Sequence, residues 1–186
     1  MTINTDTTAL LAIDILQGGA DDSIYKGAGE RFARKAADVA AACRASGVPV
    51  IFLDDAHIPG IDRELELWGT HGIADSPEAQ PADFMDPDEQ DFIIRKRRYS
   101  GFFGTDLDLT LRELGITTLV AIGCDTNICV LHTLADAFYL GYETVLVEDA
   151  TFTFLCGTQD QAIDRARTCY GSAIVSSDEL IASLRG

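Results

Sequence analysis

Short apolar segments alternate with longer amphipathic segments along this chain of 186 residues. Six short segments are apolar enough to form buried strands, and they cover residues 9–13, 48–53, 92–95, 118–122, 144–147 and 173–175. Amphipathic segments with helical spacing lie between them, at residues 30–46, 106–114, 127–140, 159–168 and from 177 onward. Apolar strands that alternate with helices are typical of a parallel sheet with helices on both faces. The pattern therefore predicts one doubly wound α/β domain over residues 1–186, with a mainly parallel sheet of about six strands.

Turn and cap residues support several of these boundaries. Gly47 follows the first predicted helix at the position where helices often end on a left-handed glycine. Thr105 with Asp108, and Ser176 with Glu179, have the spacing of a capping box. We therefore expect one of the predicted helices to begin at each of these pairs.

The charge balance changes the picture of what the surface can bind. Thirty acidic residues and fourteen basic residues give a formal net charge of −16. Such a surface repels nucleic acid and anionic membranes, so we expect neither as a partner. Aspartate outnumbers glutamate, and lysine occurs only at Lys26, Lys35 and Lys96, as in proteins of salt-loving organisms, where salt screens self-repulsion. An ordinary acidic protein is the alternative, and the sequence leaves both open.

Cysteine usage and the absence of long apolar runs indicate the compartment. Five cysteines without a Cys-x-x-Cys pair suggest neither a disulfide framework nor a cysteine-rich zinc site. No apolar run approaches the roughly 20 residues that span a bilayer, and the first residues do not resemble a signal peptide. We therefore expect a soluble, cytoplasmic protein. Gly27 and Gly29 lack the third glycine and the preceding strand of a dinucleotide motif, so we expect no organic cofactor.

In a doubly wound sheet the functional site lies beyond the carboxyl ends of the strands. Four parts of this chain qualify: Asp14, residues 54–57, the segment that starts at Lys96, and residues 123–129. Residues 55–90 carry four of the five prolines and many acids, so we predict a long and mostly irregular excursion there.

One cysteine stands where a nucleophile would be activated. A predicted strand ends at Ile122, a tight turn with Gly123 follows, and the next helix carries Cys129 near its first turn. Unpaired backbone N–H groups and the positive helix end favour a thiolate at such a place. The same N–H groups can hold an oxyanion after attack on a carbonyl. A buried core cysteine is the alternative, because a strand–turn–helix unit with such a residue is common.

Two charged residues end strands at the same edge. Lys96 follows the apolar segment 92–95, and a cation at the edge of the sheet stabilises a thiolate. Asp14 ends the apolar segment 9–13, where a carboxylate can take a thiol proton and return it to a leaving amine. The alternatives are a solvated basic run for Lys96 and a helix or turn cap for Asp14.

Together these fragments resemble the isochorismatase-like cysteine hydrolases, which include nicotinamidases, N-carbamoylsarcosine amidases and ureidoacrylate amidases. The family pattern is an aspartate after the first strand, a K-x-R-Y-S-x-F-x-G-T-x-L segment and a G-x-x-T-x-x-C-V turn. Here the motifs read L-A-I-D up to Asp14, K-R-R-Y-S-G-F-F-G-T-D-L from Lys96 and G-C-D-T-N-I-C-V from Gly123. The resemblance covers nearly the whole chain, including residues 132–137 and 141–150.

This resemblance implies a cysteine-dependent amidohydrolase that cleaves a C–N bond of a small amide, ureido or carbamoyl compound through a covalent acyl-enzyme. Cys129 would be the nucleophile, Lys96 the cation beside it and Asp14 the general base. The family often has a non-proline cis peptide in the turn, expected here at Cys124–Asp125, and the backbone N–H groups of Asp125 and Cys129 would form the oxyanion hole. We also expect a homo-oligomer. A catalytically silent binding or assembly module of the same fold is the alternative outside enzymes.

A metal site is a further candidate. Asp55 and His57 follow the second predicted strand, and His71 lies in the loop beyond it. One carboxylate and two imidazoles suit zinc or another divalent ion with open positions. Nicotinamidases of the family bind metal through similar D-x-H and W-P-x-H motifs, so a metal-assisted nicotinamidase is the alternative enzyme; hydrogen bonds that merely order the loop are the other interpretation. Departures from the family pattern at residues 15–20 and 74–78, in substrate-contacting regions, count against nicotinamide.

Overall fold

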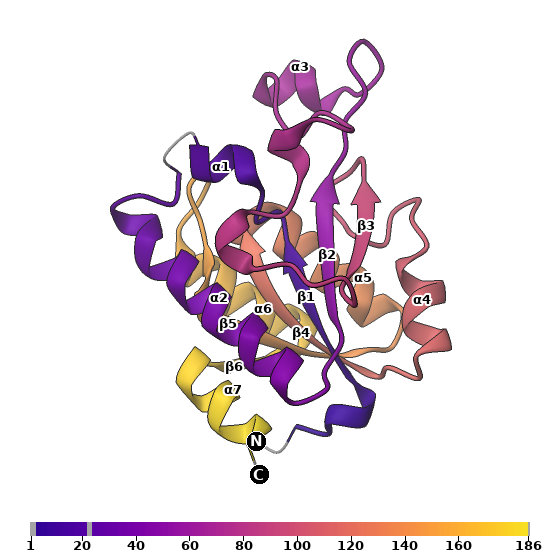
Figure 1. Cartoon of the computed structure of the whole chain (residues 1–186), viewed down its shortest axis with the longest axis vertical. Coiled ribbons are helices and arrows are strands. Elements are labelled where there is room, and N and C mark those ends of the chain that lie inside the picture. Colours follow the sequence, from indigo (N-terminus) through magenta and orange to yellow (C-terminus); the bar gives the residue numbers. More distant parts are fainter. Residues whose placement is uncertain (1–2, 22–23, 186) are drawn as a thin grey trace.

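The computed structural model of the protein describes residues 3–21 and 24–185. Its strands form one fully parallel sheet in the order β3-β2-β1-β4-β5-β6 (Figure 1). Their bounds are β1 Thr8–Ile13, β2 Val50–Asp55, β3 Phe92–Lys96, β4 Thr118–Cys124, β5 Glu143–Phe152 and β6 Ala173–Val175. All six predicted strands are confirmed, and the predicted parallel arrangement holds throughout the sheet.

Helices cover both faces of this sheet (Figure 1). One face carries α2 (Ala28–Ala45) and α7 (Ser177–Leu184), and the other carries α4 (Leu107–Glu113), α5 (Leu131–Tyr139) and α6 (Gln159–Tyr170). The chain moves outward from β1 to β3 and then, on the other side of β1, from β4 to β6. The fold is therefore the predicted doubly wound α/β class. Among the described residues, no helix combines the length and the apolar character needed to cross a membrane.

The central strand β1 shows why its sequence is apolar throughout. Leu10 and Ala12 belong to the core layer under α2 and α7, whereas Ala9, Leu11 and Ile13 belong to the layer on the opposite face. Successive side chains of a strand point to opposite faces, so a strand covered on both sides needs apolar residues at every position. All six residues of β1 are buried.

Helix ends confirm one predicted capping box and correct the other. Ser176 Oγ accepts the Glu179 N–H at 3.2 Å, and the Glu179 carboxylate accepts the Ser176 N–H at 2.8 Å. The box predicted for Thr105 and Asp108 is wrong, because α4 starts one residue later than that spacing requires. Thr105 Oγ1 instead accepts the Leu107 N–H at 3.2 Å.

The excursion after β2 holds more helix than predicted. It contains α3 (Glu64–Trp68) and the short 3-10 turns Pro77–Ala79 and Asp83–Met85. In Figure 1, α3 lies beyond the arrowheads of β2 and β3. Another short helix, α1 (Gln17–Asp21), follows β1 and was not predicted, since its five residues include two glycines.

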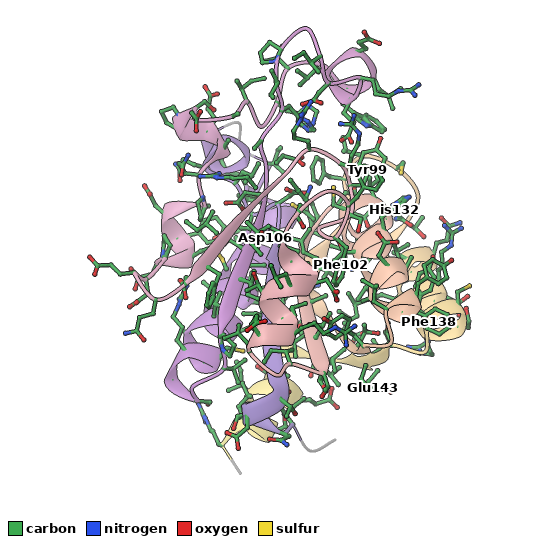
Figure 2. All side chains as sticks on the ribbon, turned by 90° about the vertical axis from the view of Figure 1, so that its right-hand side faces the viewer. Tyr99, Phe102, Asp106, His132, Phe138 and Glu143 are labelled. Atoms are coloured by element: carbon green, nitrogen blue, oxygen red, sulfur yellow. The ribbon has the colours of Figure 1, made fainter. Side chains whose placement is uncertain are left out.

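Aromatic side chains gather on the side of the molecule formed by α4, α5 and the loop after β3 (Figure 2). The rings of Tyr99 and His132 lie 5.3 Å apart between centroids. Phe102 packs against Tyr142 with centroids 5.8 Å apart. Phe138, near the end of α5, is half exposed. The contact between Tyr99 and His132 joins the loop after β3 to α5, which directly follows the turn that carries Cys129.

Candidate active site

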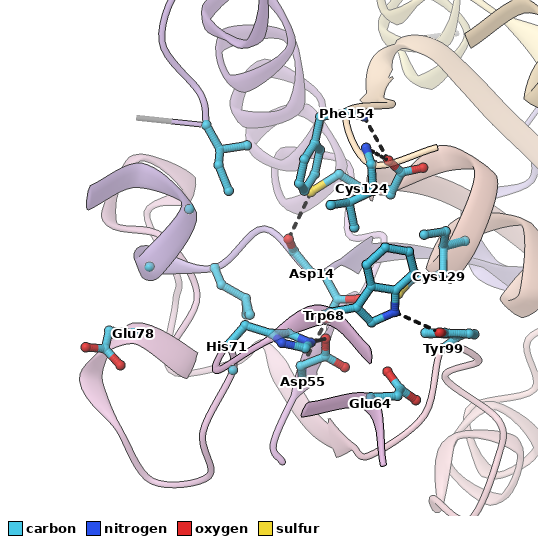
Figure 3. A pocket seen from close by; sticks show the side chains of 18 of the residues that line it. Asp14, Asp55, Glu64, Trp68, His71, Glu78, Tyr99, Cys124, Cys129 and Phe154 are labelled. Atoms are coloured by element: carbon cyan, nitrogen blue, oxygen red, sulfur yellow. Dashed lines mark hydrogen bonds and ion pairs between the residues drawn. The ribbon is translucent and has the colours of Figure 1, made fainter. Parts of the chain in front are cut away.

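The carboxyl ends of β1 to β4 meet at one edge of the sheet, where the winding direction changes between β1 and β4. The register places Asp55 beside Lys96 at the ends of β2 and β3. Residues that follow these strand ends therefore converge at the switch point. Figure 3 shows Asp14, Asp55 and Cys129 around one pocket. The structure thus brings together the catalytic residues predicted from three separate motifs.

Asp14 is held by its backbone as well as by its side chain. Its φ is 50°, in the left-handed region that aspartate tolerates better than most residues. The Asp14 N–H donates to the Leu53 carbonyl at 3.0 Å, and the Tyr25 hydroxyl and the Cys124 thiol donate to the Asp14 carbonyl at 3.3 and 3.1 Å. The Asp55 N–H donates to Asp14 Oδ1 at 3.0 Å. The second carboxylate oxygen remains for an ion pair.

Lys96 lies at the centre of the cluster, with a fully buried side chain. Its Nζ is 2.7 Å from Asp14 Oδ2 and 2.6 Å from Asp55 Oδ1, and the Cys129 sulfur is 3.7 Å away. A buried ion needs close partners, because its desolvation costs several kcal/mol. Two carboxylates supply them here, so Lys96 is not part of a solvated basic run.

Burial and mutual charge set the ionisation of the cluster. Burial and the charge of Asp55 raise the pKa of Asp14 to about 6, against the opposing effect of Lys96. Burial acts to raise the pKa of Asp55 as well, but the Lys96 ammonium and His57 together outweigh it and hold that pKa at about 2. Although burial acts to lower the pKa of Lys96, the two carboxylates raise it well above its ordinary value. At neutral pH the cluster therefore holds an ammonium, an ionised Asp55 and a largely ionised Asp14.

Cys129 lies in a single π-helical turn, η4 (Thr126–Val130), so the predicted helix 127–140 is divided into this turn and α5. Burial and the charge of Asp14 raise the pKa of the Cys129 thiol well above its ordinary value, whereas Lys96 acts to lower it. The Cys129 thiol is therefore protonated at rest and is not the expected thiolate. Lys96 lowers its pKa, as predicted, but burial raises that pKa by more. The thiol has a base nearby, since Sγ and a carboxylate oxygen of Asp14 lie within 4.8 Å of each other.

The turn that leads to Cys129 is fixed by the side chain of Asp125. The Cys124–Asp125 peptide bond is cis, which confirms the predicted position. Asp125 Oδ1 accepts the Asn127 N–H at 2.8 Å. Its Oδ2 accepts two N–H groups of the loop after β5, those of Phe154 and Leu155, each at 2.8 Å. Asp125 therefore joins the turn that carries Cys129 to the loop after β5.

Two close approaches position the same turn. Gly123 has a φ of 122°, and a Cβ on it would lie 2.0 Å from the Ile13 carbonyl oxygen, so only glycine fits. On the other side, Thr133 Oγ1 donates to the Cys129 carbonyl at 2.8 Å and accepts the Gly101 N–H at 3.0 Å. Gly123 thus packs closely on β1, and Thr133 connects Cys129 to the loop after β3 by hydrogen bonds.

Asp55, His57 and His71 form a second cluster beside the first. Asp55 Oδ2 is 3.6 Å from His57 Nε2 and 3.9 Å from His71 Nε2, and one ligand atom from each residue falls within 4.8 Å of the others. His57 is fully buried, and neither of its ring nitrogens has a hydrogen-bond partner within the described residues. His71 Nδ1 lies 2.8 Å from the Gly69 carbonyl, which makes Nδ1 the donor and leaves a lone pair on Nε2. Donor atoms of this kind and arrangement fit a divalent ion.

Both clusters open into a cavity of about 490 Å³. Its lining includes the aromatic side chains of Tyr25, Trp68, Tyr99 and Phe154, the last three of which are labelled in Figure 3. The Trp68 indole N–H donates to the Tyr99 hydroxyl at 2.9 Å, which joins α3 to the loop after β3. Tyr25 and Phe154 were not predicted as site residues, because neither belongs to a motif and only the fold brings them to the cavity.

A doubly wound sheet with Cys129, Lys96 and Asp14 clustered at its switch point defines an α/β protein of the isochorismatase-like class. The chain belongs to the isochorismatase family, since the isochorismatase domain matches residues 8–179. It is similar to the ureidoacrylate amidohydrolase RutB of Methylobacterium radiotolerans, with 35% identity over 173 aligned residues that cover 78% of this chain and 67% of the relative.

Solved structures agree with this assignment. The N-carbamoylsarcosine amidase of Thermoplasma acidophilum is 33% identical, with a TM-score of 0.81 over 92% of this chain and 97% of that chain. The pyrazinamidase/nicotinamidase of Streptococcus mutans is 30% identical, with a TM-score of 0.79 over 91% of this chain and 100% of that chain. All three relatives are named as amide-hydrolysing enzymes, so the comparisons support a hydrolase that acts on amide C–N bonds.

Proposed function

We propose that this chain is a cysteine-dependent amidohydrolase that cleaves a C–N bond of a small amide, ureido or carbamoyl compound through a covalent acyl-enzyme. The observation that carries the proposal is the position of the Cys129 sulfur, 3.7 Å from Lys96 Nζ and within 4.8 Å of a carboxylate oxygen of Asp14. A nucleophile, a cation and a base held together in a cavity are what acyl transfer requires.

In the first half-reaction, Asp14 takes the thiol proton while the Cys129 sulfur attacks the planar carbonyl carbon. A pKa of about 6 suits Asp14 to this role, because the group is mostly ionised near neutral pH yet basic enough to accept a proton. Lys96 offsets the negative charge that develops on sulfur. A thiol that burial keeps protonated at rest thus loses its proton as the new bond forms.

The carbonyl oxygen becomes an oxyanion during this attack. The backbone N–H groups of Asp125 and Cys129, at either end of the nucleophile turn, are the donors that would stabilise it. Asp14 then gives its proton to the departing ammonia or amine, and the C–N bond breaks. A thioester or thiocarbamate remains on Cys129.

In the second half-reaction, a water molecule attacks the acyl carbon and Asp14 accepts its proton. The C–S bond breaks, the acid leaves, and the proton returns to the Cys129 thiol. The net reaction consumes one water and releases one acid and one ammonia or amine. Lys96 keeps its charge throughout, because ionised Asp55 lies 2.6 Å from its ammonium and raises its pKa even while Asp14 carries the proton.

We further propose that Asp55, His57 and His71 hold one divalent ion such as zinc. When bound, the ion supplies a Lewis acid that orients a substrate nitrogen or oxygen. Asp55 has Oδ2 free for this purpose, since Oδ1 pairs with Lys96 at 2.6 Å. This cluster and the similarity to the Streptococcus mutans enzyme favour a second candidate function, a metal-assisted nicotinamidase.

A panel of small primary amides, ureido compounds and carbamoyl compounds, with nicotinamide included, tests the proposal through released ammonia. We expect turnover of a ureido or carbamoyl compound at a higher kcat/KM than nicotinamide, and none by Cys129→Ala. Turnover of nicotinamide alone would favour the second candidate. Failure of every compound, with no covalent adduct on Cys129, would favour a catalytically silent binding or assembly module.

A further inference from the structure

The cavity above the catalytic cluster is lined by acids and lacks a free cation. Asp14, Asp55, Glu64, Glu78 and Asp125 line it, and neither arginine nor lysine is among the lining residues that the structure describes. The Lys96 ammonium is not among the lining groups and is already paired at 2.7 and 2.6 Å with two of these carboxylates.

The next two basic residues along the chain form ion pairs with an acid of the chain itself. Arg97 and Arg98 follow Lys96, and both bind the carboxylate of Asp62. Arg97 contacts both oxygens of Asp62 at distances of 2.6 to 3.1 Å, and Arg98 Nη1 lies 3.1 Å from one of them. Such a bidentate pair is the arrangement that would otherwise receive a substrate carboxylate. Here Asp62 takes the place of a substrate carboxylate. Among the described residues, neither Asp62 nor the two arginines line the cavity.

In the part of the chain that the structure describes, the two outer acids of the cavity form no ion pair with an arginine or lysine. Within the described residues, Glu64 has an ion-pair contact only with His57, at 3.7 Å, and Glu78 has none. Glu64 is buried and Glu78 is exposed. In Figure 3 they lie on either side of Asp55 and His71. Glu64 and Glu78 line the same cavity as Cys129, so a ligand bound beside Cys129 shares the cavity with these two carboxylates.

From this lining we propose that the pocket selects small amides and ureas without negative charge and discriminates against ureido acids. The inference rests on the amidohydrolase function proposed above and narrows its substrate class. A substrate carboxylate would lose its water shell and face carboxylates of the same sign. An uncharged body would instead pack on the rings of Trp68, Tyr99 and Phe154, and an ammonium group would also be attracted by the acids and the rings. The selectivity differs from that of two relatives named for carboxylate-bearing compounds, ureidoacrylate and N-carbamoylsarcosine.

Three ureas that differ mainly in the charge of the far end test the inference by ammonia release. They are 3-ureidopropionate, propylurea and 2-aminoethylurea, assayed with chelator-treated and with zinc-supplemented protein. We expect kcat/KM for the anion to be at least about tenfold below that for propylurea in the chelator-treated protein, and the cation to equal or exceed propylurea. Zinc held by Asp55, His57 and His71 would add a cation to the cavity, so the difference should narrow in the zinc-supplemented protein. An anion that reacts as well as propylurea in the chelator-treated protein would overturn the inference.

A second measurement separates the charge preference from turnover. Iodoacetamides N-substituted with propyl, aminoethyl or carboxymethyl groups alkylate cysteine with the same reactive group, and peptide mass spectrometry reads each cysteine separately. Cys169, which is exposed, serves as the reference in the same sample. We expect the propyl-to-carboxymethyl rate ratio to be at least about tenfold larger at Cys129 than at Cys169. If the ratios differ while no urea is hydrolysed, the proposed function fails and the charge preference stands; equal ratios overturn the preference.

A matched pair of variants assigns the effect to the cavity. Glu78→Lys places a cation at the cavity, whereas Glu89→Lys makes the same change in net charge between Asp88 and Gln90, which line a different hollow near the start of β2. Only Glu78→Lys should raise the rate of the carboxymethyl reagent at Cys129, by several-fold. Equal changes in the two variants, or no change in either, would contradict selection by the cavity acids.

Discussion

At the scale of single residues, Lys96 makes the rest of the cluster possible. Two buried carboxylates, Asp14 and Asp55, would repel each other without the ammonium group that lies 2.7 and 2.6 Å from them. The same group is 3.7 Å from the Cys129 sulfur and acts to lower its pKa. One buried cation thus stabilises the folded cluster and opposes the effect of burial on the pKa of the Cys129 thiol.

Lys96→Met should slow alkylation of Cys129 by iodoacetamide at pH 7, by about tenfold for each unit that the thiol pKa rises. Lys35→Met is the matched control, because it removes a surface lysine paired with Asp149 and Asp178 and should leave the rate unchanged. Peptide mass spectrometry measures the rate, and circular dichroism checks that both variants fold. Equal rates in Lys96→Met and the natural protein would show that Lys96 does not act on the thiol.

The proposed metal site likewise depends on single residues, Asp55, His57 and His71. Protein purified without chelator should contain about one divalent ion per chain. His57→Ala should lose the ion, since a buried imidazole with no hydrogen-bond partner supplies one ligand, and should raise KM more than it lowers kcat. His132→Ala removes a histidine outside the cluster and should keep the ion. Elemental analysis gives the metal content, and metal-free protein that keeps full activity after chelation would reduce the three residues to ordering the loop.

At the scale of elements, the sequence predicted the sheet because each strand is a short apolar run with a clear end. Asp14 and Lys96 were recognisable because a charged residue that closes an apolar run must lie at an edge of the sheet. Cys129 was recognisable from the turn before it. The pKa of Cys129 was not predictable, since it depends on burial by residues from several elements. Nor were Tyr25, α1 and α3, because short helices and loop aromatics gain their positions from tertiary contacts rather than from local pattern.

Gly123 marks the point where two elements approach most closely. Gly123→Ala should lower the free energy of unfolding by more than about 3 kcal/mol, because its Cβ would lie 2.0 Å from the Ile13 carbonyl oxygen. Gly115→Ala is the control: its φ is also positive, at 70°, but nothing lies within 4 Å of the added Cβ, so the cost should stay near 1–2 kcal/mol. Urea denaturation measures both, and equal costs would contradict the close approach.

At the scale of the whole molecule, the acidic surface and the exposed aromatic residues bear on how the protein interacts with salt and with other chains. The chain has a formal net charge of −16 and contains only three lysines. Among the described residues, Tyr139 and Phe138 at the end of α5 are 74% and 50% exposed. The homo-oligomer expected from the sequence stays a prediction, and this end of α5 is one apolar surface available to it.

If the acidic surface is an adaptation to salt, the melting temperature should rise between low salt and molar KCl, because screening weakens self-repulsion. A gain of about 1 kcal/mol corresponds to roughly 2–4 °C for a domain of this size. Differential scanning calorimetry across the salt series measures the rise. A melting temperature that does not depend on salt would mean an ordinary acidic protein.

The central claim is that Cys129 is the nucleophile, and Cys129→Ala tests it most directly. Alanine fits the space of the cysteine in a preformed site, so the variant should fold and melt like the natural protein while kcat falls by about a thousandfold or more. Intact mass spectrometry of the natural protein, quenched during turnover of the best substrate in the panel, should show the added acyl mass on Cys129. Activity of Cys129→Ala within tenfold of the natural protein, with no adduct on the natural chain, would contradict the account.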